Sequence, residues 1–147
     1  MAKNIIVSQI GARHRYAIPN ILHKNRMLKS LFTDSYRYTI LGKISHIFLK
    51  LGSSRTAFKR LCQRLPKIPK SCIQASDKPI LKLLFKKNVD TILLNEILYF
   101  TLDNFFCKKK KIIASADCIY NMYYENLGFI KYAKEQGKTI VVRSIFY

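Results

Sequence analysis

The feature that most constrains the fold is a short apolar run near the amino terminus that ends at a glycine. Residues 4–10 (NIIVSQI) are largely apolar on both faces, as in a buried parallel strand, and Gly11 supplies a turn. Apolar residues then recur at helical spacing from Tyr16 to Met27, with Pro19 tolerated in the first turn. Residues 28–33 (LKSLFT) predict a second strand. This order predicts a βαβ unit and an α/β fold.

A second unit of the same kind is expected at the carboxyl end of the sequence. Residues 118–122 predict a strand, with 112–116 leading into it; a helix follows over about 126–136 and ends at Gly137. The β-branched run 139–142 (TIVV) predicts the next strand. Between the two units we expect short helices over 36–85 and a longer apolar helix over 91–107. We therefore predict a Rossmann-like parallel sheet flanked by helices, with Ile5, Ile6 and Val7 in a central strand.

Net charge is the outstanding property of the composition. The chain has 147 residues, about one domain, with 27 Lys and Arg against 8 Asp and Glu, a net charge of +19. Residues 1–87 carry 19 basic and 2 acidic side chains, whereas residues 88–147 carry 8 and 6. The partners are therefore expected to be anionic: nucleic acid, a membrane surface or phosphorylated substrates. The lysine run 108–111 is expected to be solvated surface charge.

The cysteines and the hydropathy pattern bear on location. Four cysteines show no CxxC pairing and no histidine at zinc-finger spacing, so we expect neither a metal site nor a disulfide framework. No stretch predicts a signal peptide or a membrane span. The expected location is the cytoplasm, either free or peripheral at the inner face of the membrane.

The first candidate site follows the first strand, because open parallel sheets bind ligands at the carboxyl ends of their strands. A glycine turn lets the backbone approach an anion, the next helix offers unpaired N–H groups, and arginines add charged hydrogen bonds. A turn glycine with exposed arginines and a surface histidine is the alternative, since the segment lacks the GxGxxG fingerprint. The candidate residues are Gly11, Ala12, Arg13, His14, Arg15 and Tyr16.

Two further clusters follow other predicted strands. Tyr120, Asn121, Tyr123 and Glu125 lie around the strand-to-helix turn of the second unit, and Asp34 follows the second strand. Glu125 could accept a proton or bind a hydroxyl, or could simply face a helix dipole. Asp34 could orient a ligand or end its strand, and Asp117 is expected to cap a turn. No Ser/His/Asp order, HExxH motif or P-loop pattern is present, so the residues alone predict no reaction.

Two segments resemble a known family. GARHRYAIPNILHKNRMLKSLFTD resembles the opening of bacterial family-four glycosyltransferases, where a G-A-R-H-x-Y-A-x-P segment precedes a helix and a strand ending in T-D. ASADCIYNMYYENLGFIKYAKEQGKTIVV resembles a later segment of the same family, with A-K-x-x-G between a helix and a strand. Together the segments cover about a third of the chain.

The resemblance implies the amino-terminal, acceptor-side domain of a GT-B fold. Such an enzyme transfers a sugar from a nucleotide-sugar donor to a cell-surface polysaccharide or glycolipid precursor, with no obligatory metal and no cofactor. The segments 11–16 and 120–125 would then line the interdomain cleft. His14 and Glu125 would be the catalytic candidates, with the other residues of the three clusters binding substrate.

Two departures from the family bear on activity. Arg143 stands where relatives often carry an acidic residue, and the donor-binding E-x7-E region has no counterpart in residues 1–147. We therefore expect a single, incomplete domain that is inactive alone and requires a separate carboxy-terminal donor domain. The alternative is a noncatalytic basic module that binds anionic membrane or nucleic acid. Lysine-rich helices favour the membrane, so nucleic acid is not the expected partner.

Overall fold

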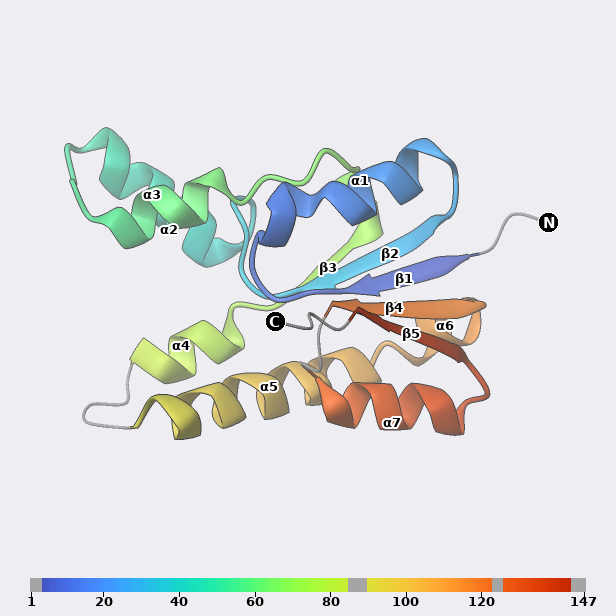
Figure 1. The fold of residues 1–147 in the computed structure, drawn as a ribbon. Helices are drawn as coiled ribbons and strands as arrows, with labels where there is room; N and C mark the ends of the chain where they lie inside the picture. Colours follow the sequence, from blue (N-terminus) through green and yellow to red (C-terminus); the bar gives the residue numbers. More distant parts are fainter. Residues whose placement is uncertain (1–3, 85–89, 123–125, 144–147) are drawn as a thin grey trace.

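The protein folds around a five-stranded sheet with helices on both faces (Figure 1). The computed structural model describes residues 4–84, 90–122 and 126–143. Neighbouring strands are all parallel, in the order β3-β2-β1-β4-β5. This confirms the predicted Rossmann-like α/β fold. The strands are β1 (Ile5–Ser8), β2 (Leu28–Thr33), β3 (Ile73–Ala75), β4 (Cys118–Met122) and β5 (Thr139–Arg143).

Strand β1 is the centre of the sheet, as predicted. Ile6 and Val7 are fully buried because each faces a different helical layer, which is why the run is apolar on both faces. Strand β5 lies at an edge of the sheet, and its residues alternate between exposed and half-buried. The alternation follows from the period-two geometry of a strand.

Seven helices and two short 3-10 turns connect the described strands. The helices are α1 (Ala17–Lys24), α2 (Ile40–Lys50), α3 (Thr56–Gln63), α4 (Lys78–Leu84), α5 (Thr91–Cys107), α6 (Lys110–Ala114) and α7 (Leu127–Glu135). The turns are η1 (Arg13–Tyr16) and η2 (Lys70–Cys72). Among the described residues, no helix is both long and apolar enough to cross a bilayer.

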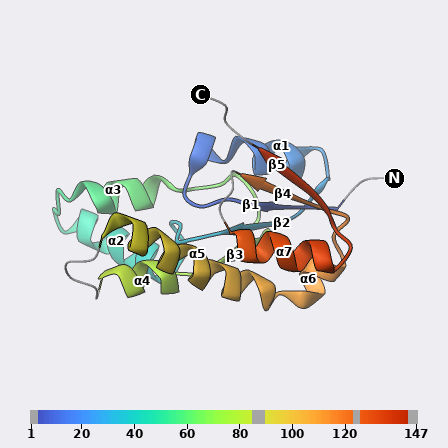
Figure 2. The ribbon, with the colours of Figure 1, turned by 60° about the horizontal axis from the view of Figure 1, so that its bottom comes forward.

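One core lies between the sheet and helices α5, α6 and α7, which cover the face seen in Figure 2. Phe32 of β2, Phe106 of α5 and Phe129 of α7 form its aromatic centre, with ring centroids 5.1–5.5 Å apart. All three side chains are fully buried, and each burial contributes about 1.5–3 kcal/mol. This cluster holds α5 and α7 in fixed positions beneath β1 and β4.

A second, smaller core lies on the α1 face of the sheet. Val7, Leu31 and Ile73 come from three adjacent strands, and Tyr16 covers them from the turn that precedes α1. The apolar side chains Ile18 and Leu22 of α1 pack against this cluster. The two cores place α1 and α7 on opposite faces of the sheet.

Helices α2 and α3 form an arm that projects beyond the carboxyl ends of β1 and β2 (Figure 1). The amino end of α2 is held by Thr39, whose Oγ1 accepts from Gly42 N at 3.4 Å, and by Asp77, whose Oδ2 accepts from Leu41 N at 3.0 Å. The carboxyl end of α3 is tied back by a bond of 3.1 Å from Arg37 N to Arg64 O. The two ends of the arm are therefore tied to each other, and α2 is also tied to the segment that follows β3.

The structure corrects the sequence prediction in three places. The first helix ends at Lys24 rather than near Met27, because Arg26 takes a left-handed conformation with φ 57°. Strand β3 lies inside the stretch predicted as short helices. Residues 112–114, which were expected to lead into a strand, belong to α6. No disulfide joins the four cysteines, all of which lie in the part of the chain that the structure describes.

Candidate ligand-binding edge of the sheet

The strand order places a topological switch point between β1 and β4. The chain leaves β1 through α1 on one face and leaves β4 through α7 on the other. Helices that diverge in this way leave a crevice at the carboxyl ends of the two strands, where open α/β sheets bind ligands. The segment after Ser8 and the carboxyl end of β4 therefore define the candidate site.

The turn after β1 is built by backbone and side-chain bonds. Gln9 N donates to Phe32 O at 3.0 Å, which extends the pairing with β2 past the end of β1. Gln9 Nε2 donates to Gly11 O at 3.0 Å, and Gly11 has φ 71°, a conformation that favours glycine. The predicted glycine turn is thus present at the carboxyl edge of the central strand.

A left-handed backbone turn follows the glycine. His14, Arg15 and Tyr16 have φ of 48°, 52° and 59°, three consecutive residues without a glycine in a region that costs about 1–3 kcal/mol each. His14 and Arg15 are exposed, whereas Tyr16 is buried in the α1-side core. Burial of Tyr16 anchors the strained turn and leaves its two basic neighbours at the surface.

Burial also changes the chemistry of the Tyr16 phenol. Its pKa is raised far above the ordinary value, first by loss of solvent and then by the charge of Asp34, which outweigh the opposing effect of Arg64. The phenol is therefore neutral at every physiological pH and cannot serve as a general base there.

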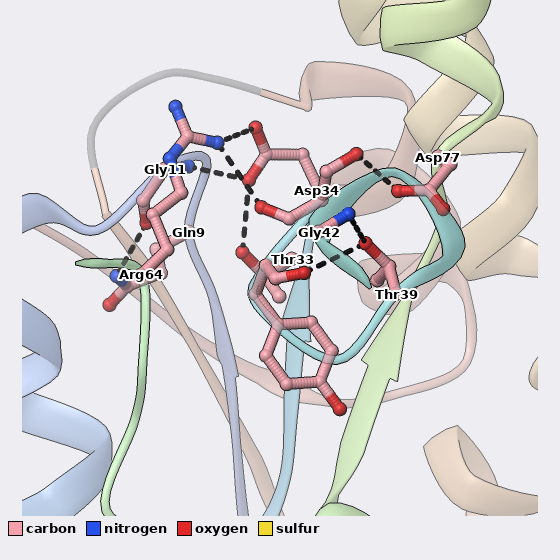
Figure 3. A network of polar contacts seen from close by, with 10 residues as sticks. Gln9, Gly11, Thr33, Asp34, Thr39, Gly42, Arg64 and Asp77 are labelled. Carbon is pink, nitrogen blue, oxygen red and sulfur yellow. Dashed lines mark hydrogen bonds and ion pairs between the residues drawn. The ribbon is translucent and has the colours of Figure 1, made fainter. Parts of the chain in front are cut away.

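Asp34 links the turn to the arm (Figure 3). Its Oδ1 accepts from Gly11 N at 2.8 Å and from Thr33 Oγ1 at 3.3 Å, while its Oδ2 pairs with Arg64 Nη1 at 2.8 Å. The same Arg64 nitrogen donates to Ser35 O at 3.2 Å. The buried carboxylate thus fixes both Gly11 and the guanidinium that lies beside it.

Arg64 is the residue of this site that sequence reasoning missed. A Cβ added at Gly11 would lie 3.7 Å from Arg64 Nη2, so the guanidinium covers the glycine turn. Residues 35–76 contain nine Lys or Arg and no acidic residue, and no local pattern marks Arg64 among them. Only the fold brings it back to Asp34.

The β4 side of the site is described in part. Asn121 is buried opposite Ser8, and Tyr120 lies half-buried against the α1-side core, opposite Val7. Tyr123 and Glu125 lie outside the described residues. Asp117 lies at the opposite, amino edge of the sheet, where its Oδ2 accepts from Asn4 N at 2.8 Å. It caps the start of β1, whereas the sequence predicted that it caps a turn.

Several polar atoms at this edge are buried. Within the described part of the chain, Ser8 Oγ and Gln9 Oε1 have no hydrogen-bond partner. Buried polar groups are normally satisfied, so such atoms mark a place for water or a polar ligand. No group of three or more His, Cys, Asp or Glu among the described residues could hold a metal ion.

Of the predicted site residues, the structure brings together Gly11, His14, Arg15, Asp34 and Asn121 at one edge of the sheet. Ala12 lies half-buried in the same turn, and the side chain of Arg13 lies outside what the structure describes. The edge is positive, polar and partly preformed, which suits an anionic ligand.

Comparison with protein families, with curated proteins and with solved structures found no match to this chain. The glycosyltransferase resemblance therefore stays a prediction.

Proposed function

We propose that this chain is the acceptor-side domain of a GT-B glycosyltransferase. One observation carries the proposal. About eighty residues separate the two segments that resemble the family, yet the first begins directly after β1 and the second contains β4, the adjacent strands on either side of the crevice. A ligand edge shared by these two segments is what an acceptor domain requires.

The proposed acceptor is phosphorylated, as lipid-linked or polysaccharide precursors are. Its phosphate would lie over the Gly11 turn, where the Arg64 guanidinium, the exposed Arg15 and the amino terminus of α1 provide positive charge. Asp34 would not contact the acceptor, because its carboxylate is buried and already bound to Gly11 and Arg64. It would hold the Gly11 turn and the Arg64 guanidinium in position.

Catalysis would require a carboxy-terminal donor domain in addition to these residues. Holding donor and acceptor together is worth on the order of 7–11 kcal/mol, and one half of a cleft forfeits most of it. The reaction would be glycosyl transfer from a nucleotide sugar, with His14 and Glu125 as the candidate acid–base groups. The proposed location is the inner face of the membrane.

The first experiment measures radiolabelled sugar incorporation from a panel of nucleotide sugars. We expect no turnover by the chain alone and turnover when the donor domain of a family-four glycosyltransferase is added in trans. His14→Ala should lower that turnover at least tenfold, and Lys110→Gln, a change of an exposed lysine on α6, should leave it within twofold. Turnover by the chain alone would contradict the proposal.

A second experiment tests the acceptor edge without any donor domain. Addition of farnesyl diphosphate to the labelled protein should shift the Gly11 amide resonance in NMR spectra, because that N–H lies at the proposed phosphate site. Arg15→Gln should weaken this binding several-fold, whereas Lys110→Gln should not. Shifts confined to residues away from β1 and β4 would place the anion elsewhere and refute the assignment.

A further inference from the structure

Helix α2 exposes an apolar stripe to solvent. Ile40, Ile47 and Leu51 are 71%, 57% and 77% exposed, and Ile44 and Phe48 are also exposed. Their spacing of three, four and seven residues places them on one side of the helix. Single exposed apolar residues are common, but a continuous helical stripe of five marks an interaction surface.

The orientation of this stripe is fixed by the opposite side of α2. Gly42 and Ser45 are buried there, and a Cβ added at Gly42 would lie under 3.0 Å from main-chain atoms of Tyr36 and Arg37. Cys62 of α3 also contacts this side through a bond of 3.9 Å to Gly42 O. Helix α2 cannot turn its apolar stripe inward without losing this close approach.

Positive charge flanks the stripe. Lys43 and Lys50 are exposed on α2, and α3 and the residue before it add exposed basic side chains. Between α2 and α3 an open hollow of about 350 Å³ is lined by Arg37, His46, Leu49, Lys50, Lys59, Cys62 and Gln63. Three Lys or Arg side chains, one histidine and no carboxylate line this space, so its chemistry suits a phosphate group.

The arm is stiffened by aromatic contacts between its helices. The rings of Phe48 and Phe58 stack with centroids 5.6 Å apart, and the guanidinium of Arg55 lies 5.8 Å from the Phe58 ring centre. The apolar stripe and the basic hollow are thus held in one rigid unit, which lowers the entropy lost when both engage the same partner.

We propose that the α2–α3 arm is a docking surface for a bilayer that contains anionic phospholipid. The stripe of Ile40, Ile44, Ile47, Phe48 and Leu51 enters the boundary between headgroups and acyl chains, and the basic hollow binds a lipid phosphate. This inference goes beyond the proposed glycosyltransferase function and does not depend on it.

Charge and polarity together select the bilayer over other occupants. Nucleic acid would pair with the lysines and arginines but would leave the isoleucines and Leu51 in water. A second copy of the chain, docked through the same surface, would bring the exposed basic side chains of the two arms together, and their like charges would repel. These side chains are Lys43, Lys50, Arg55, Lys59 and Arg60. An anionic lipid surface offers apolar depth and negative charge at one interface.

The sharpest test uses a tryptophan, because the natural sequence contains none. Ile47→Trp introduces a single reporter at an exposed position of the stripe, and Leu127→Trp introduces one at an exposed position of α7. With vesicles of phosphatidylcholine and 30% phosphatidylglycerol, emission of the Ile47→Trp protein should shift to the blue. Lipids brominated in the acyl chain should also quench the fluorescence of this tryptophan. An unshifted Ile47→Trp, or an equal shift for Leu127→Trp, would overturn the proposal.

Sedimentation with the same vesicles separates the apolar and charge contributions. Ile47→Gln with Leu51→Gln should weaken binding about tenfold or more, whereas Ile21→Gln with Leu127→Gln, matched changes at exposed sites on α1 and α7, should not. Lys50→Gln and Lys59→Gln should each weaken binding about fivefold. Wild-type affinity in the stripe variant would refute lipid insertion.

Two further measurements separate the bilayer from other anions. The first compares inorganic phosphate with chloride, at equal ionic strength, in displacing the protein from vesicles. Better displacement by phosphate would assign the hollow to free phosphate and overturn the lipid proposal. Tighter binding to a DNA duplex than to the vesicles at matched ionic strength would overturn it in favour of nucleic acid. We expect neither, and we expect binding to pure phosphatidylcholine to be at least tenfold weaker.

Discussion

Substitution of Asp34 by asparagine should destabilise the protein although it changes only one atom. The carboxylate accepts from Gly11 N through one oxygen and from Arg64 Nη1 through the other, each at 2.8 Å. An asparagine has one acceptor oxygen and one amide nitrogen, so it can keep only one of these bonds. Its NH2 group would face either the Gly11 amide or the guanidinium, donor against donor.

The size of the effect follows from the burial of the pair. Loss of one partner of a fully buried ion pair costs about 3–5 kcal/mol. The Arg64 side chain is 27% exposed and retains its bond to Ser35 O, so we expect a smaller loss of about 2–4 kcal/mol in the free energy of unfolding. For a domain of this length the midpoint of thermal unfolding should fall by about 5–12 °C.

Denaturant unfolding of the wild type, the two single variants and the double variant measures the coupling energy of the ion pair. Arg64→Met should cost about 1.5–3 kcal/mol, and the double variant Asp34→Asn/Arg64→Met should be more stable than the sum of the single losses predicts, by at least about 1 kcal/mol. Glu96→Gln, an exposed change on α5, should stay within about 0.5 kcal/mol. Additive losses, or an Asp34→Asn protein as stable as Glu96→Gln, would refute the role given to the ion pair.

Three other substitutions test the packing of the arm, the packing of the core and the pH dependence of stability. Gly42→Ala should destabilise the α2–α3 arm by about 1–3 kcal/mol, because the new methyl group meets backbone atoms. Gly52→Ala should cost about 1 kcal/mol, because the space around it is open but its φ is 89°. Unchanged hydrogen exchange in α2 of the Gly42→Ala protein would contradict this. Phe106→Ala should cost about 3–5 kcal/mol and the exposed Phe100→Ala under about 1 kcal/mol in chemical unfolding, and equal losses would mean that the aromatic core is misassigned. Burial raises the pKa of Asp103 in the folded protein. Its contribution to the free energy of unfolding is therefore fully present below the unfolded pKa of about 3.9 and is lost as pH rises through the higher folded pKa. Asp103→Asn should remove this loss of stability, and parallel stability–pH curves for the two proteins would exclude it.

The central strands could be predicted from the sequence because burial on both faces leaves a continuous apolar run. Strand β3 could not, since it has three residues and only Ile73 of them is buried. Its pairing with β2 comes from the fold and from the bond of 3.0 Å between Ser30 Oγ and Cys72 O. Helix α6 was missed because its five residues carry too little periodicity to separate a helix from a strand.

The candidate site could be predicted where it follows a strand end. Gly11 and Asp34 each come directly after an apolar run, so their place at one edge follows from parallel pairing. The left-handed turn at His14, Arg15 and Tyr16 has no clear sequence signal, because positive φ is uncommon for Arg and Tyr and a single His does not mark a run of three such residues. It depends on the burial of the Tyr16 ring, a tertiary contact that a local pattern does not encode.

The central position of β1 delays its full pairing during synthesis of the chain. Asn4 and Ile5 meet Asp117 and Cys118 across 113 residues of sequence, so one edge of the central strand has no partner until β4 leaves the ribosome. At about 5–20 residues per second this wait lasts on the order of 6–20 s. During it, β1 presents unpaired backbone groups along that edge to other nascent chains. The nascent chain is therefore most open to association with other chains before β4 has been synthesised.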